Sequence, residues 1–205
     1  MARNFDTVKI KPHYHHGDLR AALIEAAEGL LAECGPDRFS LREAARRAGV
    51  SPAAPKHHFH DARGLLTAIA VRAFDDLAAR LEVAAEGSDD RIECIRAQGR
   101  AYVRFALDER ARFDLMWRTA LLDGEDAELD RAGRRAFAAL DRLVRGKDAV
   151  ALARDDPATA PSVACWSMVH GFARLALDGS FGLDEKAAAR AAEALLPLVL
   201  DRLSL

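Results

Sequence analysis

The chain has 205 residues and a formal net charge of −2 at pH 7. It contains 43 Ala and 26 Leu but only 10 Val, 5 Ile and 4 Thr. Because Ala and Leu favour helices whereas β-branched residues favour strands, this composition predicts an all-α protein and argues against a fold built on a sheet. The small net charge, averaged over the whole chain, argues against a protein that binds nucleic acid.

Apolar residues at helical spacing, separated by Gly, Pro, Asp and Ser, predict about nine helices. Asp18 is expected to cap the first helix, and Ser40 the second, with Glu43 completing a capping box. Ser51 and Pro52 are the expected N-cap and first residue of a third, very short helix. The other six helices are expected at residues 61–86, 90–107, 110–122, 127–145, 162–177 and 185–203.

These elements predict two domains. Residues 1–75 hold three short helices and the start of the long fourth helix, whereas residues 76–205 form a larger helical body. Residues 1–60 contain nine Lys or Arg, seven Asp or Glu and six of the seven histidines. The whole-chain charge therefore hides a local positive excess on the short helices, and this excess suits a nucleic-acid partner.

Residues 41–59 have the pattern of a helix-turn-helix. One face of the second helix is formed by the small or apolar residues Leu41, Ala44, Ala45 and Ala48. Gly49 suits a left-handed turn, and Val50 can fill the space between the two helices. The helix that follows such a turn fits the major groove of DNA, although short helices joined by a Gly turn also occur in other helical proteins.

The residues expected to contact DNA lie on or beside the third helix. They are Arg42, Ser51, Pro52, Ala53, Ala54, Lys56, His57, His58 and Arg63. The Ala and Pro side chains can contact a thymine methyl group, Ser51 can bond a base or a phosphate, and Lys56 suits a phosphate. Arg46 and Arg47 form either further contacts or an ordinary solvated face.

From Tyr14 to about Ala73 the chain resembles the N-terminal DNA-binding domain of TetR-type transcriptional regulators. The similarity lies in YHHGDLRAALIEAAEGLLAECG, in FSLREAARRAGVSPAAPKHHF and in the pair Leu65–Leu66. Residues 166–171, WSMVHG, are similar to a W-x-x-x-H-G motif in the C-terminal domain of one TetR subgroup. The resemblance implies a homodimer, expected to be a repressor, that binds a palindromic operator in double-stranded DNA and is released by an unknown small-molecule effector.

Two positions depart from the family pattern. Lys56 stands where the family usually has Tyr, and Ala62, followed by Arg63, stands where it often has Lys. A lysine can still contact a phosphate as a point charge, so these changes affect individual contacts rather than the motif.

In the body, apolar stripes on the last two helices suit a dimer interface, or else packing within one subunit. The expected interface residues are Val163, Ala173, Leu177, Ala188, Ala191, Leu195 and Leu198. An apolar effector pocket, with ordinary core packing as the alternative, is expected at Tyr102, Phe105, Phe113, Met116, Trp117, Trp166 and His170.

Other functional classes have little support. The sequence shows no nucleophile–base motif, phosphate-binding Gly loop or metal-ligand spacing, so we expect neither an enzyme nor a cofactor or metal. Cys34, Cys94 and Cys165 are scattered, and neither a signal peptide nor a membrane span is evident, which favours the cytoplasm. The remaining alternative is a helical interaction module that has lost DNA binding.

Overall fold

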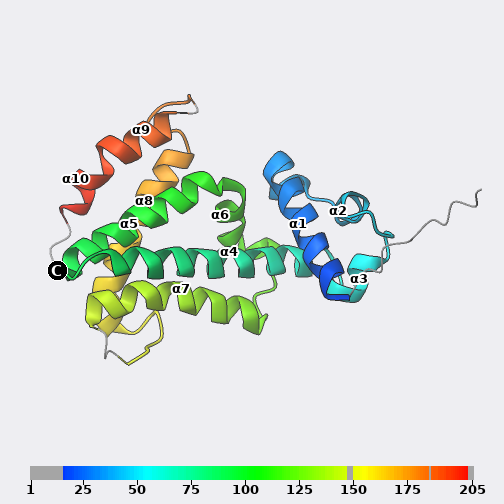
Figure 1. The fold of residues 1–205 in the computed structure, drawn as a ribbon, viewed down its shortest axis with the longest axis horizontal. Helices are drawn as coiled ribbons and strands as arrows, with labels where there is room; N and C mark the ends of the chain where they lie inside the picture. Colours follow the sequence, from blue (N-terminus) through cyan, green and yellow to red (C-terminus); the bar gives the residue numbers. More distant parts are fainter. Residues whose placement is uncertain (1–15, 147–149, 185, 203–205) are drawn as a thin grey trace, which may run out of the picture.

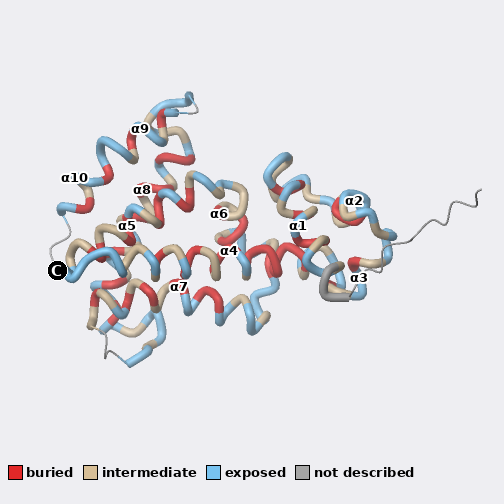
Figure 2. The backbone as a smooth tube through the Cα atoms, viewed as in Figure 1, coloured by how far each residue is buried: buried red, intermediate tan, exposed pale blue. Residues whose placement is uncertain are grey.

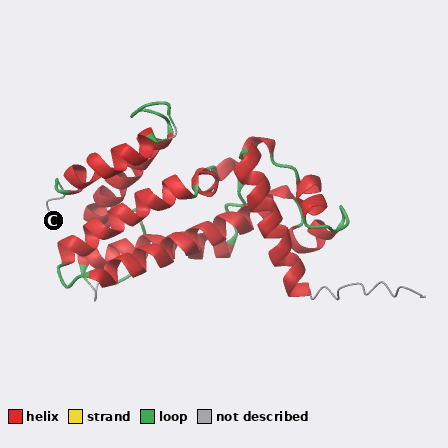
Figure 3. Cartoon of the chain, turned by 45° about the horizontal axis from the view of Figure 1, so that its top comes forward, coloured by secondary structure: helices red, strands yellow, loops and turns green. Residues whose placement is uncertain are grey.

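The computed structural model describes residues 16–146, 150–184 and 186–202. Over these residues the protein consists of helices and loops without a strand, as Figures 1 and 3 show, so the all-α prediction is confirmed. The α-helices are α1 (His16–Cys34), α2 (Leu41–Arg47), α3 (Ala54–Phe59), α4 (Ala62–Ala84), α5 (Arg91–Asp108), α6 (Arg110–Met116), α7 (Ala127–Arg145), α8 (Ala160–Leu177), α9 (Ala187–Ala194) and α10 (Leu196–Leu200). Short 3-10 helices lie at η1 (Pro36–Arg38), η2 (Ala85–Gly87), η3 (Thr119–Leu121) and η4 (Pro157–Thr159).

The last predicted helix is divided into two. α9 ends at Ala194 and α10 begins at Leu196, with Leu195 between them at φ −102°. Pro197 explains the break, because its ring removes a backbone donor and clashes with the carbonyl four residues earlier. The expected end of this helix at Leu203 lies outside the described residues. So do His13 and His15, two of the six histidines in residues 1–60.

Other helix limits also differ from those predicted. α1 begins at His16, so Asp18 lies inside it rather than at its N-cap. The sixth helix ends at Met116 and is followed by the separate turn η3, because the chain changes direction at Trp117 and Arg118.

The third helix begins two residues later than predicted. The backbone N–H of Ala54 donates to the carbonyl of Ser51 (3.0 Å), which closes a turn before α3. Pro55, not Pro52, occupies the first turn of this helix. The sequence SPAAP offers two prolines for that position, and the structure uses the second.

α4 is the axis of the molecule. Its 23 residues extend for about 35 Å at 1.5 Å per residue. In Figure 1 it runs from helices α1–α3 to the far end of the body, and Figure 2 shows buried positions along its length. The buried side chains form two large clusters that meet on this helix between Ala70 and Ala73.

The two clusters are also joined by residues 110–122, which we call the bridging segment. Leu115 and Leu122 of this segment are buried among residues of α1, α2, α3 and the start of α4. Phe113 and Met116 from the same segment are buried in the cluster of the body. The bridging segment is therefore part of both cores.

The junction between α3 and α4 leaves no room for a side chain at Gly64. Asp61 caps α4 by accepting a bond from the Gly64 N–H (2.9 Å), and its own N–H donates to the carbonyl of Phe59 (2.7 Å). A Cβ at Gly64 would lie 2.0 Å from that carbonyl oxygen. His60, between the two helices, adopts φ +61° in the left-handed region.

The substitution Gly64→Ala is expected to lower the free energy of unfolding by about 1–3 kcal/mol, because its methyl group overlaps a backbone carbonyl that moves only if α3 moves. Chemical denaturation followed by circular dichroism measures the effect. Gly29→Ala in α1 is the matched control: nothing lies within 4 Å of its Cβ, so removing this helix glycine should stabilise the protein by about 0.5–1 kcal/mol. Equal effects of the two substitutions would contradict the close contact.

Candidate DNA-binding face and effector cavity

The turn between α2 and α3 is fixed by local hydrogen bonds. The Ser40 hydroxyl caps α2 by accepting a bond from the Glu43 N–H (3.4 Å). At the other end, Gly49 adopts φ +69°, and the Val50 N–H donates to the carbonyl of Ala45 (3.0 Å). A left-handed glycine that closes the last turn of a helix is a common helix end, and here it turns the chain toward α3.

α3 is held by its buried side and presents the other side to solvent. Pro55 and Phe59 are buried, and the Arg20 guanidinium of α1 lies 5.2 Å from the centre of the Phe59 ring. The solvent-facing residues of this region are Ser51, Pro52, Ala53, Lys56 and His57, while Ala54 and His58 are half-buried. Seven of the nine predicted DNA contacts are thus gathered on one helix and the turn before it.

Two arginines of α2, close to α3, already form ion pairs with glutamates. Arg46 bonds Glu43 (2.7 Å), and Arg47 bonds both Glu33 (2.6 Å) and Glu43 (3.1 Å). These guanidinium groups hold the pKa of Glu43 near 2. Arg46 and Arg47 therefore form an exposed ion-pair network. Arg42 is also exposed at the start of α2.

Arg63 at the start of α4 lies beside the bridging segment. Its guanidinium donates to the carbonyl of Ala120 (3.2 Å), although the side chain stays exposed. Arg63, a predicted phosphate contact, is therefore already hydrogen-bonded to the bridging segment, residues 110–122.

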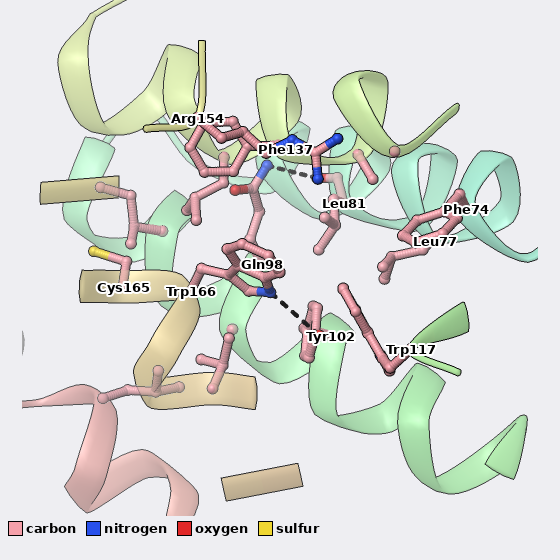
Figure 4. Close-up of a pocket in the computed structure, with 17 residues that line it drawn as sticks. Phe74, Leu77, Leu81, Gln98, Tyr102, Trp117, Phe137, Arg154, Cys165 and Trp166 are labelled. Atoms are coloured by element: carbon pink, nitrogen blue, oxygen red, sulfur yellow. Dashed lines mark hydrogen bonds between the residues drawn. The ribbon is translucent and has the colours of Figure 1, made fainter. Parts of the chain in front are cut away.

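The body contains an apolar cavity between α4, α5, α7 and α8, drawn in Figure 4. About 620 Å³ in this region is not filled by protein atoms, and part of this space is open to solvent. Little of it is free space deep inside the body, and we call this narrow cavity the slot. Its larger lining side chains are Phe74, Leu77, Leu81, Ile95, Gln98, Tyr102, Trp117, Phe137, Leu140, Arg154, Trp166, Val169 and Leu200.

The structure brings only part of the predicted pocket to this cavity. Tyr102, Trp117 and Trp166 line it. The other four predicted residues do not line it. Phe105, Phe113 and Met116 are buried core residues that point into contacts between helices, whereas His170 is half-buried and packs against the rings of Tyr102, Phe113, Trp117 and Trp166.

His170 takes part in a hydrogen-bonded chain with two cavity residues. Its Nδ1 lies 2.8 Å from the Tyr102 hydroxyl, and Trp166 Nε1 donates to the same hydroxyl (3.4 Å). Burial, with a smaller contribution from the Arg174 charge, lowers the pKa of His170, which favours the neutral ring at pH 7. In the neutral ring with its proton on Nε2, Nδ1 accepts a hydrogen bond from the Tyr102 O–H, so the Tyr102 hydroxyl and Trp166 Nε1 are already engaged.

Sequence reasoning missed the polar cavity residue Gln98. It is 2% exposed, and its Nε2 donates to the carbonyls of Leu81 (3.0 Å) and Ala139 (3.1 Å). Its Oε1 has no hydrogen-bond partner among the described residues. A single glutamine on a helix leaves no periodic pattern, so only the packing of α5 between α4 and α7 reveals it.

The predicted interface residues divide by exposure. Ala173, Leu177 and Ala191 are buried within the subunit, because α8 and α9 pack on α5 and on each other. Val163 and Ala188 are half-buried. Leu195 and Leu198 are 43% and 60% exposed, and so is Leu175 of α8, at 50%, which the sequence pattern did not single out.

Two further features concern metal ligands and membrane spans. Within residues 16–146, 150–184 and 186–202, no three His, Cys, Asp or Glu side chains gather as metal ligands would. No helix in that part of the chain has the length and apolar character of a membrane span.

Comparison with known proteins agrees with this architecture. The family model "Bacterial regulatory proteins, tetR family" matches residues 23–69, and "Tetracyclin repressor-like, C-terminal domain" matches residues 95–198. No curated protein sequence matches the chain.

Solved structures of similar chains include three that align over almost their whole length. A protein with unknown function from Rhodococcus sp. RHA1 is 34% identical, with 91% of this chain and 98% of that chain covered and a TM-score of 0.70. The TetR family transcriptional regulator PfmR from Thermus thermophilus is 26% identical, with 89% and 99% covered and a TM-score of 0.58. A TetR family transcription regulator from Marinobacter aquaeolei, 23% identical with 89% and 94% covered and a TM-score of 0.59, shares the fold. The chain belongs to the TetR family of transcriptional regulators, with an N-terminal helix-turn-helix DNA-binding domain and a C-terminal helical domain.

Proposed function

We propose that the protein is a homodimeric repressor of the W-x-x-x-H-G subgroup that binds a palindromic operator and leaves it when a small molecule enters the cavity. Residues 1–75 bind DNA, and residues 76–205 dimerise and bind the effector. The observation that carries this proposal is the position of the bridging segment: Trp117 lines the cavity, while Leu115 and Leu122 are buried in the core of the DNA-binding domain. A ligand that moves Trp117 therefore acts on the residues that hold that domain.

Polar contacts tie the bridging segment to the DNA-binding domain at several points. Arg118 pairs with Asp37 of η1 (2.7 Å), and the Asp123 N–H, just after the segment, donates to the Thr67 hydroxyl on α4 (2.9 Å). Arg112 lies 3.5 Å from Glu28 of α1 and also pairs with Asp76 of α4. These contacts, together with the buried leucines, link the position of the segment to the direction of α1 and α4.

For DNA binding, the exposed side of α3 would enter the major groove. Lys56 and His57 suit phosphates and position the protein, while Ser51, Pro52 and Ala53 face the bases. A dimer would place two such helices about one turn of DNA apart, roughly 34–36 Å, which matches a palindromic site.

For dimerisation, the candidates are the exposed apolar side chains of α8 and of the region around α10. Leu175, Leu195 and Leu198 are large apolar residues that water would otherwise cover. Burial of such residues between two copies related by a two-fold axis stabilises the dimer.

The substitution Lys56→Ala is expected to weaken operator binding roughly equally for all DNA sequences and to reduce the slope of log K against log salt by about 0.9, the value for one lost phosphate contact. Fluorescence anisotropy with palindromes from the gene's own upstream region measures both quantities. Lys186→Ala, on an exposed residue before α9, is the matched control and should change neither. A marked change in base preference would contradict the phosphate role, and absence of salt-sensitive binding by the unaltered protein would favour an interaction module instead.

The substitution Leu195→Glu is expected to raise the dimer dissociation constant at least tenfold, because a charge would be buried without a partner at the interface. Sedimentation analysis measures the association, and affinity for a palindrome should fall with it. Val83→Glu is the control, since Val83 is 68% exposed but lies on α4. If both substitutions left the dimer intact, or both disrupted it, the surface around α10 would not be the interface.

A further inference from the structure

One polar atom in the cavity is left without a hydrogen bond. Gln98 Oε1 is buried and has no partner among the described residues, whereas the Gln98 Nε2 bonds two backbone carbonyls. The orientation of this amide is fixed, because turning it over would place Oε1 against the carbonyl oxygens of Leu81 and Ala139. A buried acceptor without a partner is costly, so the site favours a molecule that supplies a donor.

The other polar groups deep in the cavity offer less. The Tyr102 hydroxyl and Trp166 Nε1 bond one another, and Tyr102 also bonds His170. The walls are otherwise aromatic and aliphatic: Phe74 and Trp117 meet edge to face at 5.5 Å, and Trp117 and Trp166 lie 5.6 Å apart. These rings contact one another, and together with the aliphatic side chains they form an apolar wall that suits an aromatic molecule.

A positive charge lies beside the slot. Arg154 lines the cavity, on the side opposite Trp117 in Figure 4. Its guanidinium rests on α7 where Gly133 leaves room for it, since a Cβ there would lie 3.3 Å from the Arg154 Nη2. It forms a long, partly exposed ion pair with Asp130 (4.0 Å), and the lining residues of the cavity include no Asp or Glu. Although aromatic walls attract cations, this arrangement opposes a cationic ligand.

We infer that the cavity takes a flat, largely aromatic molecule, uncharged or anionic, that donates one hydroxyl or N–H hydrogen bond to Gln98 Oε1. This inference rests on the proposed function insofar as the cavity is the effector site. It adds the chemical class of the effector and names Gln98 as the residue that determines specificity.

Three related probes test the inference on the unaltered protein: biphenyl-4-ol, 4-methoxybiphenyl and biphenyl-4-ylmethylammonium. The chain has two tryptophans, Trp117 and Trp166, and both line the cavity, so quenching of tryptophan fluorescence reports binding there. The phenol is expected to bind at least tenfold more tightly than the methyl ether, which has nearly the same shape but lacks the donor. It should also bind at least tenfold more tightly than the ammonium compound, which has donors but carries a positive charge.

Variants identify the residues responsible. Gln98→Met should abolish the preference for the phenol over the ether, and Arg154→Ala should narrow the gap between the phenol and the ammonium compound. Arg104→Ala, at an exposed position on α5 outside the cavity lining, should leave both ratios unchanged. Because Gln98→Met also removes two backbone contacts and can impair folding, the ligand ratios of the unaltered protein decide the matter without it.

Equal affinity for the phenol and the ether would overturn the role of Gln98, and tighter binding of the ammonium compound would overturn the charge preference. Failure of every probe to quench the tryptophans would overturn the ligand class. In each case salt-sensitive binding to a palindrome, measured in parallel, would still support the proposed DNA-binding function, so the two failures are distinguishable.

Discussion

The structure depends on the insertion of Leu115 and Leu122 into the core of the DNA-binding domain. That domain is small, and besides Phe59 the large side chains that it buries are a few Leu and Ile residues of α1 and of the start of α4: Leu23, Ile24, Leu30, Leu31, Leu65, Leu66 and Ile69. A domain of this size gains little from a core built only from its own residues, so two fully or nearly fully buried leucines from another part of the chain matter for its stability. Because the same segment carries Phe113 into the core of the body, the two domains cannot change their relative position without repacking it.

Ion pairs also hold the bridging segment against α1 and α4, and they centre on the partly buried Glu28. Glu28 of α1 lies between Arg72 of α4 and Arg112 of α6, and burial raises the pKa of this carboxyl despite both arginines. A half-buried charge pair is a weak source of net stability, yet removing one member leaves the other without compensation. The cluster therefore favours one arrangement of α1, α4 and α6 more than it adds to stability.

The sequence predicted local features well because short-range interactions determine them. The Ser40 cap, the left-handed Gly49 and the burial of Ala44 and Ala45 all follow from patterns within a few residues. The whole-chain charge was misleading, since it averages over two unlike domains. The sequence predicted three aromatic residues of the cavity lining, Tyr102, Trp117 and Trp166. It did not predict Phe74, Phe137, Gln98 or Arg154, which meet there only through the packing of segments far apart in the sequence. The start of α3 was ambiguous because two prolines were available to fix it.

In the proposed function, two parts of the chain connect the cavity to the DNA-binding domain. One is α4 and the other is the bridging segment. Leu77 and Leu81 place α4 in the cavity wall, while Trp117 places the bridging segment there. α4 meets α3 where Gly64 touches the carbonyl of Phe59, so a change in the direction of α4 reaches α3 with little loss. A ligand that widens the narrow slot would thus alter the spacing of the two recognition helices in a dimer. Since such coupling is reciprocal, DNA that holds the helices at operator spacing would also hold the slot narrow and lower its affinity for the effector.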